Sequence, residues 1–311
     1  MSNVYINQPQ VVASVYSLVM KVRANTISDE DIEIQLNALY YPFMAYFSTD
    51  LQYSKPVEMF FHATKLIVGN LEPTDVLWNC DTTHKFIGIL RYFKHNDILI
   101  ENALLDYQNT QNKKHLAHYI SSTIDHHSKL IFVYIELTYE QESCHHVTIE
   151  LFNHHVNTLK TLMDDKKMCF KHLHGHAWTI QQQGGDMGLH CNLLLMFDGS
   201  MQDSDWYLAK EVGEKWKAIT AGLGEYDTYN DIERKLFNAR GTIFGLGTIR
   251  NHKPKEVEKA LRGAWFLLPT CLDYEGLHLK LRLPNMPTFG HGLYDVPKPL
   301  EYSNSKKISN I

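Results

Sequence analysis

Two runs of β-forming residues flank a glycine-rich turn near the middle of the chain. The first run is HAWTIQQ (176–182), the turn is QGGDMG (183–188), and the second run is LHCNLLLMF (189–197). Runs of this length joined by a glycine-rich turn are typical of a β-hairpin. Odd positions of the second run are all apolar and so predict a buried face: Leu189, Cys191, Leu193, Leu195 and Phe197. The chain is therefore expected to contain an antiparallel sheet with a covered face.

The pattern around this hairpin predicts an α+β domain over residues 128–292. KLIFVYIELT (129–138) reads as another strand, and apolar spacings of three and four predict helices near 152–163, 205–220 and 254–268. GTIFGLGTI (241–249) is a further, glycine-containing strand. The resulting order β-α-β-β-α-β-α is typical of a ferredoxin-like antiparallel sheet with helices packed on one face.

Residues 1–127 show helical periodicity instead. Apolar residues between 11 and 22 recur on one helix face, Ser28 is a candidate helix cap, and a helix is expected to open at Pro56 and end at Gly69. The polar segment YQNTQNKKH (107–115) interrupts the periodicity and predicts a break before a short helix. We therefore expect a helical N-terminal region, the domain over 128–292 and a polar tail over 293–311.

Composition narrows the environment in which the chain can act. No apolar run approaches the ~18 residues of a membrane-spanning helix, and the first residues lack a basic segment followed by an apolar one. The five cysteines are scattered and never form C-x-x-C, which argues against a disulfide framework or a zinc knuckle. We therefore expect a cytoplasmic protein that does not bind membranes.

Charge confines any nucleic-acid contact to one part of the chain. Its 30 basic and 35 acidic side chains give a net charge of −5, whereas proteins that neutralise phosphates are usually basic. Residues 240–282 are the exception, with a cluster of basic side chains at helical and alternating spacings. The candidate DNA-contacting residues are Arg250, Lys253, Lys255, Lys259, Arg262, Lys280 and Arg282. The alternative interpretation is a solvent-exposed helix face, whose positive charge Glu256 and Glu258 partly offset.

Polar side chains gather at the turn end of the hairpin. Pairing across the turn is expected to place Gln182 beside His190, and Ile180 beside Asn192. Because alternate strand residues share a face, Gln182, His190 and Asn192 would converge. An imidazole and two amide oxygens could hold Mn²⁺ or Mg²⁺, although carboxylates would bind either cation better. The alternative is a half-exposed polar face that carries one histidine.

Several segments occur in the order and spacing of one known family. They are FVYIELTY (132–139), the hairpin over 176–197, EKWKAITAGLGEY (214–226), GLGTIR (245–250) and PTFGHG (287–292). Together they resemble the replication proteins of filamentous phages (inoviruses) and prophages, the YagK/YfjJ C-terminal type of the HUH endonuclease superfamily. The resemblance implies rolling-circle replication, in which hairpin-bound Mn²⁺ or Mg²⁺ polarises a DNA phosphate and a tyrosine attacks it. The implied partner is single-stranded or hairpin DNA.

The metal ligands that this resemblance implies are only partly present. His190 matches the first histidine of the family's metal motif. Asn192 stands in the place of the second histidine, and Gln182 (or Gln181) stands in the place of the acidic ligand. An amide lacks the charge of a carboxylate, so these replacements are expected to weaken metal binding severely.

The implied nucleophile is also replaced. Where the last helix of the family carries Y-L-T-K, this chain has Trp265 and Leu268 at the tyrosine and lysine positions. The resemblance thus predicts a pseudoenzyme: a DNA-binding protein of a phage-derived or mobile element with degraded nicking activity. One alternative is an active nickase that uses Tyr207 and Lys210, which share the Y-x-x-K spacing on the helix after the hairpin. Another is a regulatory or interaction protein that does not bind DNA.

Overall fold

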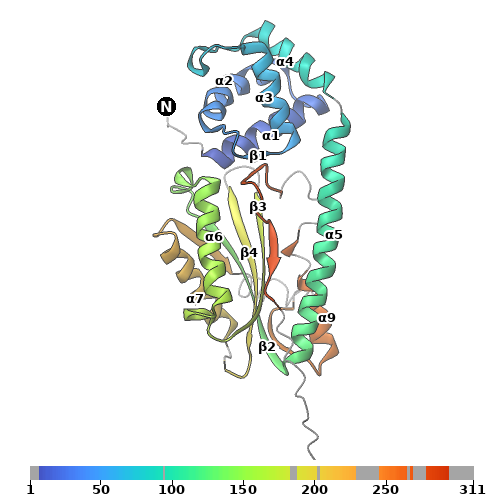
Figure 1. Cartoon of the computed structure of the whole chain (residues 1–311), viewed down its shortest axis with the longest axis vertical. Coiled ribbons are helices and arrows are strands. Elements are labelled where there is room, and N and C mark those ends of the chain that lie inside the picture. The colour runs from blue at the N-terminus through green and yellow to red at the C-terminus, as the bar shows by residue number, and fades with distance from the viewer. Residues whose placement is uncertain are drawn as a thin grey trace, which may run out of the picture.

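The computed structural model describes residues 7–93, 95–182, 188–201, 204–228, 245–264, 267–268 and 278–293. It shows an α+β protein, with a helical N-terminal region at one end of a six-stranded antiparallel sheet that helices cover (Figure 1). None of the described helices is both long enough and apolar enough to cross a lipid bilayer. Beyond Leu293, the predicted polar tail lies outside the described residues.

In the described part of the N-terminal region, four α-helices precede α5, and capping residues define several of their ends. They are α1 (Gln8–Ala24), α2 (Asp29–Tyr46), α3 (Lys55–Val68) and α4 (Cys80–Tyr92). The Asn7 side chain accepts a hydrogen bond from the backbone of Gln10 at the start of α1, and Ser28 caps α2 as predicted. Gly69, which has a positive φ of 66°, ends α3. The predicted helical N-terminal region is confirmed.

Helix α5 (His95–His126) is continuous over 32 residues, so the predicted interruption at 107–115 is wrong. At ~1.5 Å per residue the helix is ~48 Å long. Figure 1 shows it leaving the helical region and running down one side of the sheet. Its middle is polar because it spans from one packed region to the other, and a bridging helix needs no continuous apolar stripe.

The sheet is built around the predicted hairpin. Its strands are β2 (Lys129–Tyr139), β3 (Leu173–Gln182), β4 (Leu189–Asp198), β5 (Gly224–Thr228), β6 (Gly247–Arg250) and β8 (Phe289–His291). The spatial order is β5-β2-β4-β3-β8, with β6 pairing the first half of β2. The predicted strand over 241–249 corresponds to β6, with positions 241–244 outside the described residues. Strands β5 and β8 were not predicted.

Helices cover both faces of the sheet, which corrects the expectation of a single covered face. α6 (Ile149–Asp164) and α7 (Asp205–Ile219) pack on one face, whereas α5 and α9 (Pro254–Ala264) pack on the other. The even positions of β4 give the reason, because Leu194 and Met196 are as apolar as the odd positions and need a cover of their own. We call these two sides the α6/α7 face and the α5/α9 face.

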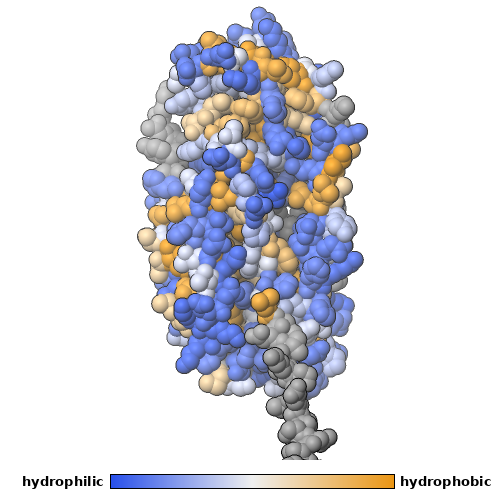
Figure 2. Space-filling view, viewed as in Figure 1, coloured by the Kyte–Doolittle hydropathy of each residue, from blue (hydrophilic) through white to orange (hydrophobic). Residues whose placement is uncertain are grey.

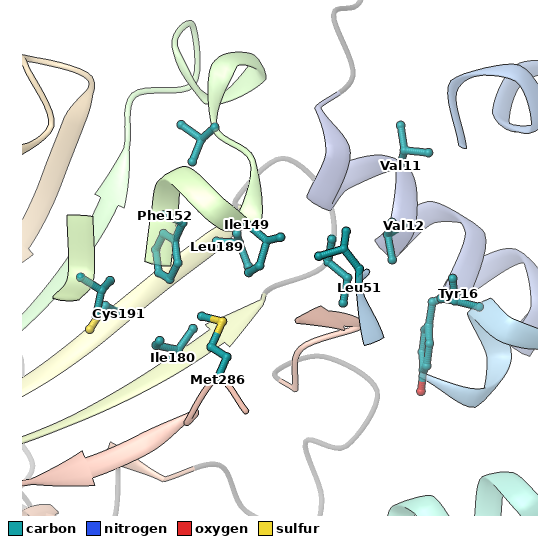
Figure 3. Packing of buried hydrophobic residues seen from close by; sticks show 14 of the residues in the cluster. Val11, Val12, Tyr16, Leu51, Ile149, Phe152, Ile180, Leu189, Cys191 and Met286 are labelled. Carbon is teal, nitrogen blue, oxygen red and sulfur yellow. The ribbon is translucent and has the colours of Figure 1, made fainter. Parts of the chain in front are cut away.

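The helical region and the sheet share one core across the predicted boundary at 127/128. Val11, Val12 and Leu51 of the helical region belong to the same hydrophobic cluster as Ile149 and Met286 of the sheet region, and Figure 3 shows Leu51 between the two groups. The short strand β1 (Gln52–Tyr53) also pairs with β7 (Leu281–Arg282). The boundary therefore separates kinds of secondary structure, while the packing continues through it.

Candidate functional site

The hairpin has a register one residue away from the predicted one. Gln181 pairs with His190, and Thr179 pairs with Asn192. A slip of one residue moves every side chain of a strand to the other face, so Gln181 takes the place expected for Gln182. The difference lies in the length of the turn, and positions 183–187 of that turn are outside the described residues.

Gln182 therefore lies on the α6/α7 face, away from His190. Its side-chain nitrogen donates to the carbonyl oxygen of Pro9 at 2.7 Å, and its side-chain oxygen accepts from the backbone nitrogen of Lys280 at 2.8 Å. Gln182 is completely buried. It joins the start of α1 to the segment before β7 and cannot serve as a ligand beside His190.

On the α5/α9 face, Gln181, His190 and Asn192 form a buried amide–imidazole network. The Oε1 atom of Gln181 lies 3.1 Å from Asn192 Nδ2 and 3.3 Å from His190 Nε2. The Nε2 atom of Gln181 donates to the carbonyl oxygen of Leu267 at 3.3 Å. A carbonyl only accepts, so this bond fixes the amide orientation and leaves Oε1 facing Asn192 and His190. The contact with His190 is a hydrogen bond in the tautomer that carries the ring proton on Nε2.

Two carboxylates flank the network. Glu136 Oε1 lies 3.6 Å from His190 Nε2, and Glu136 is paired with Asn192 on one side and with Asp227 on the other. Burial raises the pKa of Asp227, and the neighbouring charge of Glu136 raises it further. Burial lowers the pKa of His190, an effect that Glu136 opposes. Glu136 was missed from the sequence, although it is the one charged residue within the run over 130–137.

These side chains do not fit Mn²⁺ or Mg²⁺. Both cations favour several oxygen ligands, usually including carboxylates. Here Glu136 lies beside His190, but the other two groups are amides, and Gln181 Oε1 already accepts from Asn192 Nδ2. Among the described residues, no group of three histidine, cysteine, aspartate or glutamate side chains could hold a metal ion.

Tyr207 and Lys210 lie on the opposite side of the sheet from His190. Both belong to α7, whose buried residues Leu208 and Val212 pack on the α6/α7 face. The side chain of Tyr207 points outward, with 48% of its surface exposed, and its hydroxyl donates to Glu211 at 2.8 Å. The structure therefore does not bring the alternative nucleophile and the hairpin network together.

The segment that follows α9 does reach the network. Leu267 supplies the carbonyl oxygen that receives the Gln181 amide, and Leu268 is buried beside it. A cavity of about 640 Å³ opens at this point, between α5 and the β3–β8 edge, with Thr179, Leu268 and Phe289 in its wall. Trp265, the residue at the predicted tyrosine position, lies outside the described residues.

The basic residues around α9 form an exposed face that is partly neutralised. α9 buries Ala260 and Ala264 and exposes Lys255, Lys259 and Arg262. Glu256 pairs with Arg250 at 2.9 Å and with Lys253 at 3.4 Å, while Glu258 pairs with Arg262. Between residues 250 and 264, five basic and two acidic side chains leave a local charge of +3.

Lys280 was predicted to contact DNA, but this residue is buried. Only 2% of it is exposed, and its ammonium donates to the carbonyl oxygens of His278 and Gln182. Lys280 and Arg282 were expected on the same exposed face of a strand, but the strand β7 begins only at Leu281. Arg282 remains exposed, and its Nε donates to Gln52 on β1 at 3.0 Å.

Comparisons with known proteins identify no relative. No protein-family model, no curated protein and no solved structure matches this chain.

Proposed function

We propose that this protein binds single-stranded or hairpin DNA for a phage-derived or other mobile element, and that it descends from a rolling-circle replication initiator without retaining nicking activity. The supporting observation is the contact between Gln181 and Leu267. This contact brings the metal-motif positions of the resembled family next to the segment that would carry its nucleophile. In this chain, amides replace ligands at the metal-motif positions, and Trp265 and Leu268 replace the tyrosine and lysine of the nucleophile segment.

Loss of nicking follows from what these residues can do. A nicking enzyme needs a Lewis acid at the scissile phosphate and an oxygen nucleophile beside it. The network offers two neutral amides and one imidazole, with Glu136 as the carboxylate beside it. Trp265 provides no oxygen, and Leu268 provides no charge. Binding is then the activity that such a scaffold retains.

The α9 face is the best surface for DNA among the described residues. Its exposed lysines Lys255 and Lys259 are spaced by one helical turn, which suits contact with successive phosphates. The surface over α9 in Figure 2 is mostly hydrophilic, whereas an apolar patch covers the first half of α5. The local positive charge around α9 would attract DNA phosphates even though the chain as a whole is negatively charged.

Fluorescence anisotropy with labelled single-stranded and hairpin oligonucleotides tests the binding proposal. The combined Lys255→Glu and Lys259→Glu variant is expected to bind roughly tenfold or more weakly and to show a shallower salt dependence. Lys65→Glu with Lys85→Glu is the matched control, because both lysines are exposed on the helical region and the charge change is identical. Equal weakening by both variants would argue against α9. Failure of the wild-type protein to bind even at low salt would favour the interaction-only alternative.

A nicking assay with Mn²⁺ tests the loss of catalysis separately. End-labelled oligonucleotides should remain intact on a denaturing gel while a retarded band forms on a native gel. A protein-linked product would overturn the proposal, and its disappearance in Tyr207→Phe would then establish the active-nickase alternative. Calorimetry provides a second readout: combining Gln181→Glu with Asn192→His is expected to create Mn²⁺ binding that the wild-type protein lacks.

A further inference from the structure

Helix α5 carries large apolar side chains on its outer face. Leu99, Ile100, Leu104 and Tyr107 each have between 50% and 65% of their surface exposed. Ile100, Leu104 and Tyr107 follow the i, i+4, i+7 spacing of one helix face, and Figure 2 shows an apolar patch over the first half of the helix. Apolar patches with polar surroundings are typical of interaction surfaces. We call Ile100, Leu104 and Tyr107 the α5 row.

Other side chains of α5 hold the helix in the fold. Ile98 is buried in the core that the helical region shares with the sheet. Near the other end of the helix, Leu116, Ile120 and Ile124 are buried on the α5/α9 face. These residues anchor α5 at both ends, so the α5 row between them is available for contact with another molecule.

Charges of opposite sign lie along the two halves of α5. The acidic side chains of the first half and the basic lysines of the second are Asp97, Glu101, Asp106, Lys113 and Lys114. Asp97 comes three residues before Ile100, and Lys114 comes seven residues after Tyr107, so both continue the face of the α5 row. Both are exposed, and neither forms a salt bridge with another described residue of the chain.

We propose that the α5 row binds a second copy of this chain, with the two α5 helices packed antiparallel about a two-fold axis. An antiparallel pair brings Leu104 beside the partner's Tyr107 and places Asp97 opposite the partner's Lys114. A parallel pair would instead place like charges together. The arrangement of charge is thus self-complementary, which favours a second copy over an unrelated partner. The inference concerns α5 alone and does not depend on the proposed DNA-binding function.

Sedimentation velocity of the full chain over a range of about 1 to 200 μM tests the association. The wild-type protein is expected to form a dimer as its concentration rises. Leu104→Glu should raise the Kd of that dimer roughly tenfold or more, because each dimer then buries two carboxylates in an apolar contact. Leu66→Glu on α3 is the matched control, since Leu66 is 71% exposed on another helix. A monomer at every concentration, or equal weakening by both variants, would overturn the proposal.

Charge exchange tests the antiparallel orientation. Asp97→Lys and Lys114→Asp should each weaken the dimer roughly threefold or more at low salt, because each variant places like charges opposite one another. Combining both changes in one chain restores opposite charges at both ends of the pair, and the Kd should return to that of the wild-type protein. No weakening by the single variants, or no recovery in the combined variant, would overturn the antiparallel arrangement. Melting temperatures verify folding, and failure of DNA binding at α9 would leave these results untouched.

Discussion

The two faces of the sheet use the same strands in different ways. The α6/α7 face is apolar along the length of β4, from Leu189 to Phe197. On the α5/α9 face, β4 is apolar at Met196 and Leu194. Nearer the start of the strand, the same face carries the polar residues Asn192 and His190. Both ends are buried, so the difference is chemical and does not reflect exposure to water.

This contrast teaches where stability and specificity reside in the molecule. The α6/α7 face gains free energy in proportion to the apolar area that it buries. The polar half of the α5/α9 face gains little net energy, because its hydrogen bonds replace those with water, but leaving one unmade is costly. The first face holds α6 and α7 on the sheet, and the second fixes the positions of particular atoms.

The largest effect is expected from removing an anchor of the α6/α7 face. Trp216 on α7 is fully buried, and its indole nitrogen donates to the carbonyl oxygen of Thr138 at 2.8 Å. Trp216→Ala should lower the free energy of unfolding by about 3–5 kcal/mol, as measured by urea denaturation. Trp206→Ala on the same helix is the control, because 46% of Trp206 is exposed. Similar losses in both variants would contradict the assignment of the buried face.

Acid should weaken the same side of the sheet through His176. Burial holds the pKa of His176 at about 4, while Asp164 at 3.4 Å opposes the shift and His291 and Lys160 add to it. The unfolded chain binds this proton near pH 6.5, so stability present above that pH is lost as the pH falls to 4. Between pH 6.5 and pH 4, the free energy of unfolding of His176→Gln should therefore fall by about 2–3 kcal/mol less than that of the wild-type protein. Parallel pH profiles from urea denaturation would refute the prediction.

Sequence periodicity predicted the elements with a repeating apolar pattern. The helices α1, α2 and α3 and the strands β2, β3 and β4 were all expected. The middle of α5 was missed because a helix that bridges two packed regions shows no apolar stripe. Cover on the second face was not predicted because Asn192 and His190 indicate a half-exposed polar face, whereas Leu194 and Met196 on that face are buried under α5 and α9.

A smaller effect is expected from the polar half of the α5/α9 face. Gln181→Leu keeps a similar volume but leaves Asn192, His190 and the Leu267 carbonyl without their partner. The free energy of unfolding should fall by about 1–3 kcal/mol. Adding Asn192→Leu removes one of the buried donors that lost its acceptor, and this second change should recover part of the lost stability. Additive losses in the double variant would show that the two amides do not form one network.

The smallest effects are expected at two glycines, one closely packed on α7 and one beside open space on α4. A methyl group at Gly213 would collide with the Tyr226 ring of β5, whereas Gly88 on α4 has no neighbour within reach. Gly213→Ala should destabilise the protein by about 1 kcal/mol, because overpacking outweighs the gain in helix propensity. Gly88→Ala should stabilise it by up to ~1 kcal/mol. Stabilisation by both variants in thermal melts would mean that α7 can shift on the sheet.

The site was less predictable than the fold, for physical reasons. The histidine and asparagine were found, but the register depends on the geometry of the turn, which composition does not determine. Lys280 follows the alternation of an exposed strand, yet its burial depends on Tyr16 and Gln182, far away in the sequence. Contacts between distant segments leave no local periodic signal.

The shared core between the helical region and the sheet has a consequence for inheritance. Gln182 binds the Pro9 carbonyl, and β1 pairs with β7, so each part supplies atoms that the other requires. A recombination event at the 127/128 junction would join two halves shaped for different partners. Neither part is therefore expected to keep its shape when it is inherited without the other, because each covers apolar surface of its neighbour.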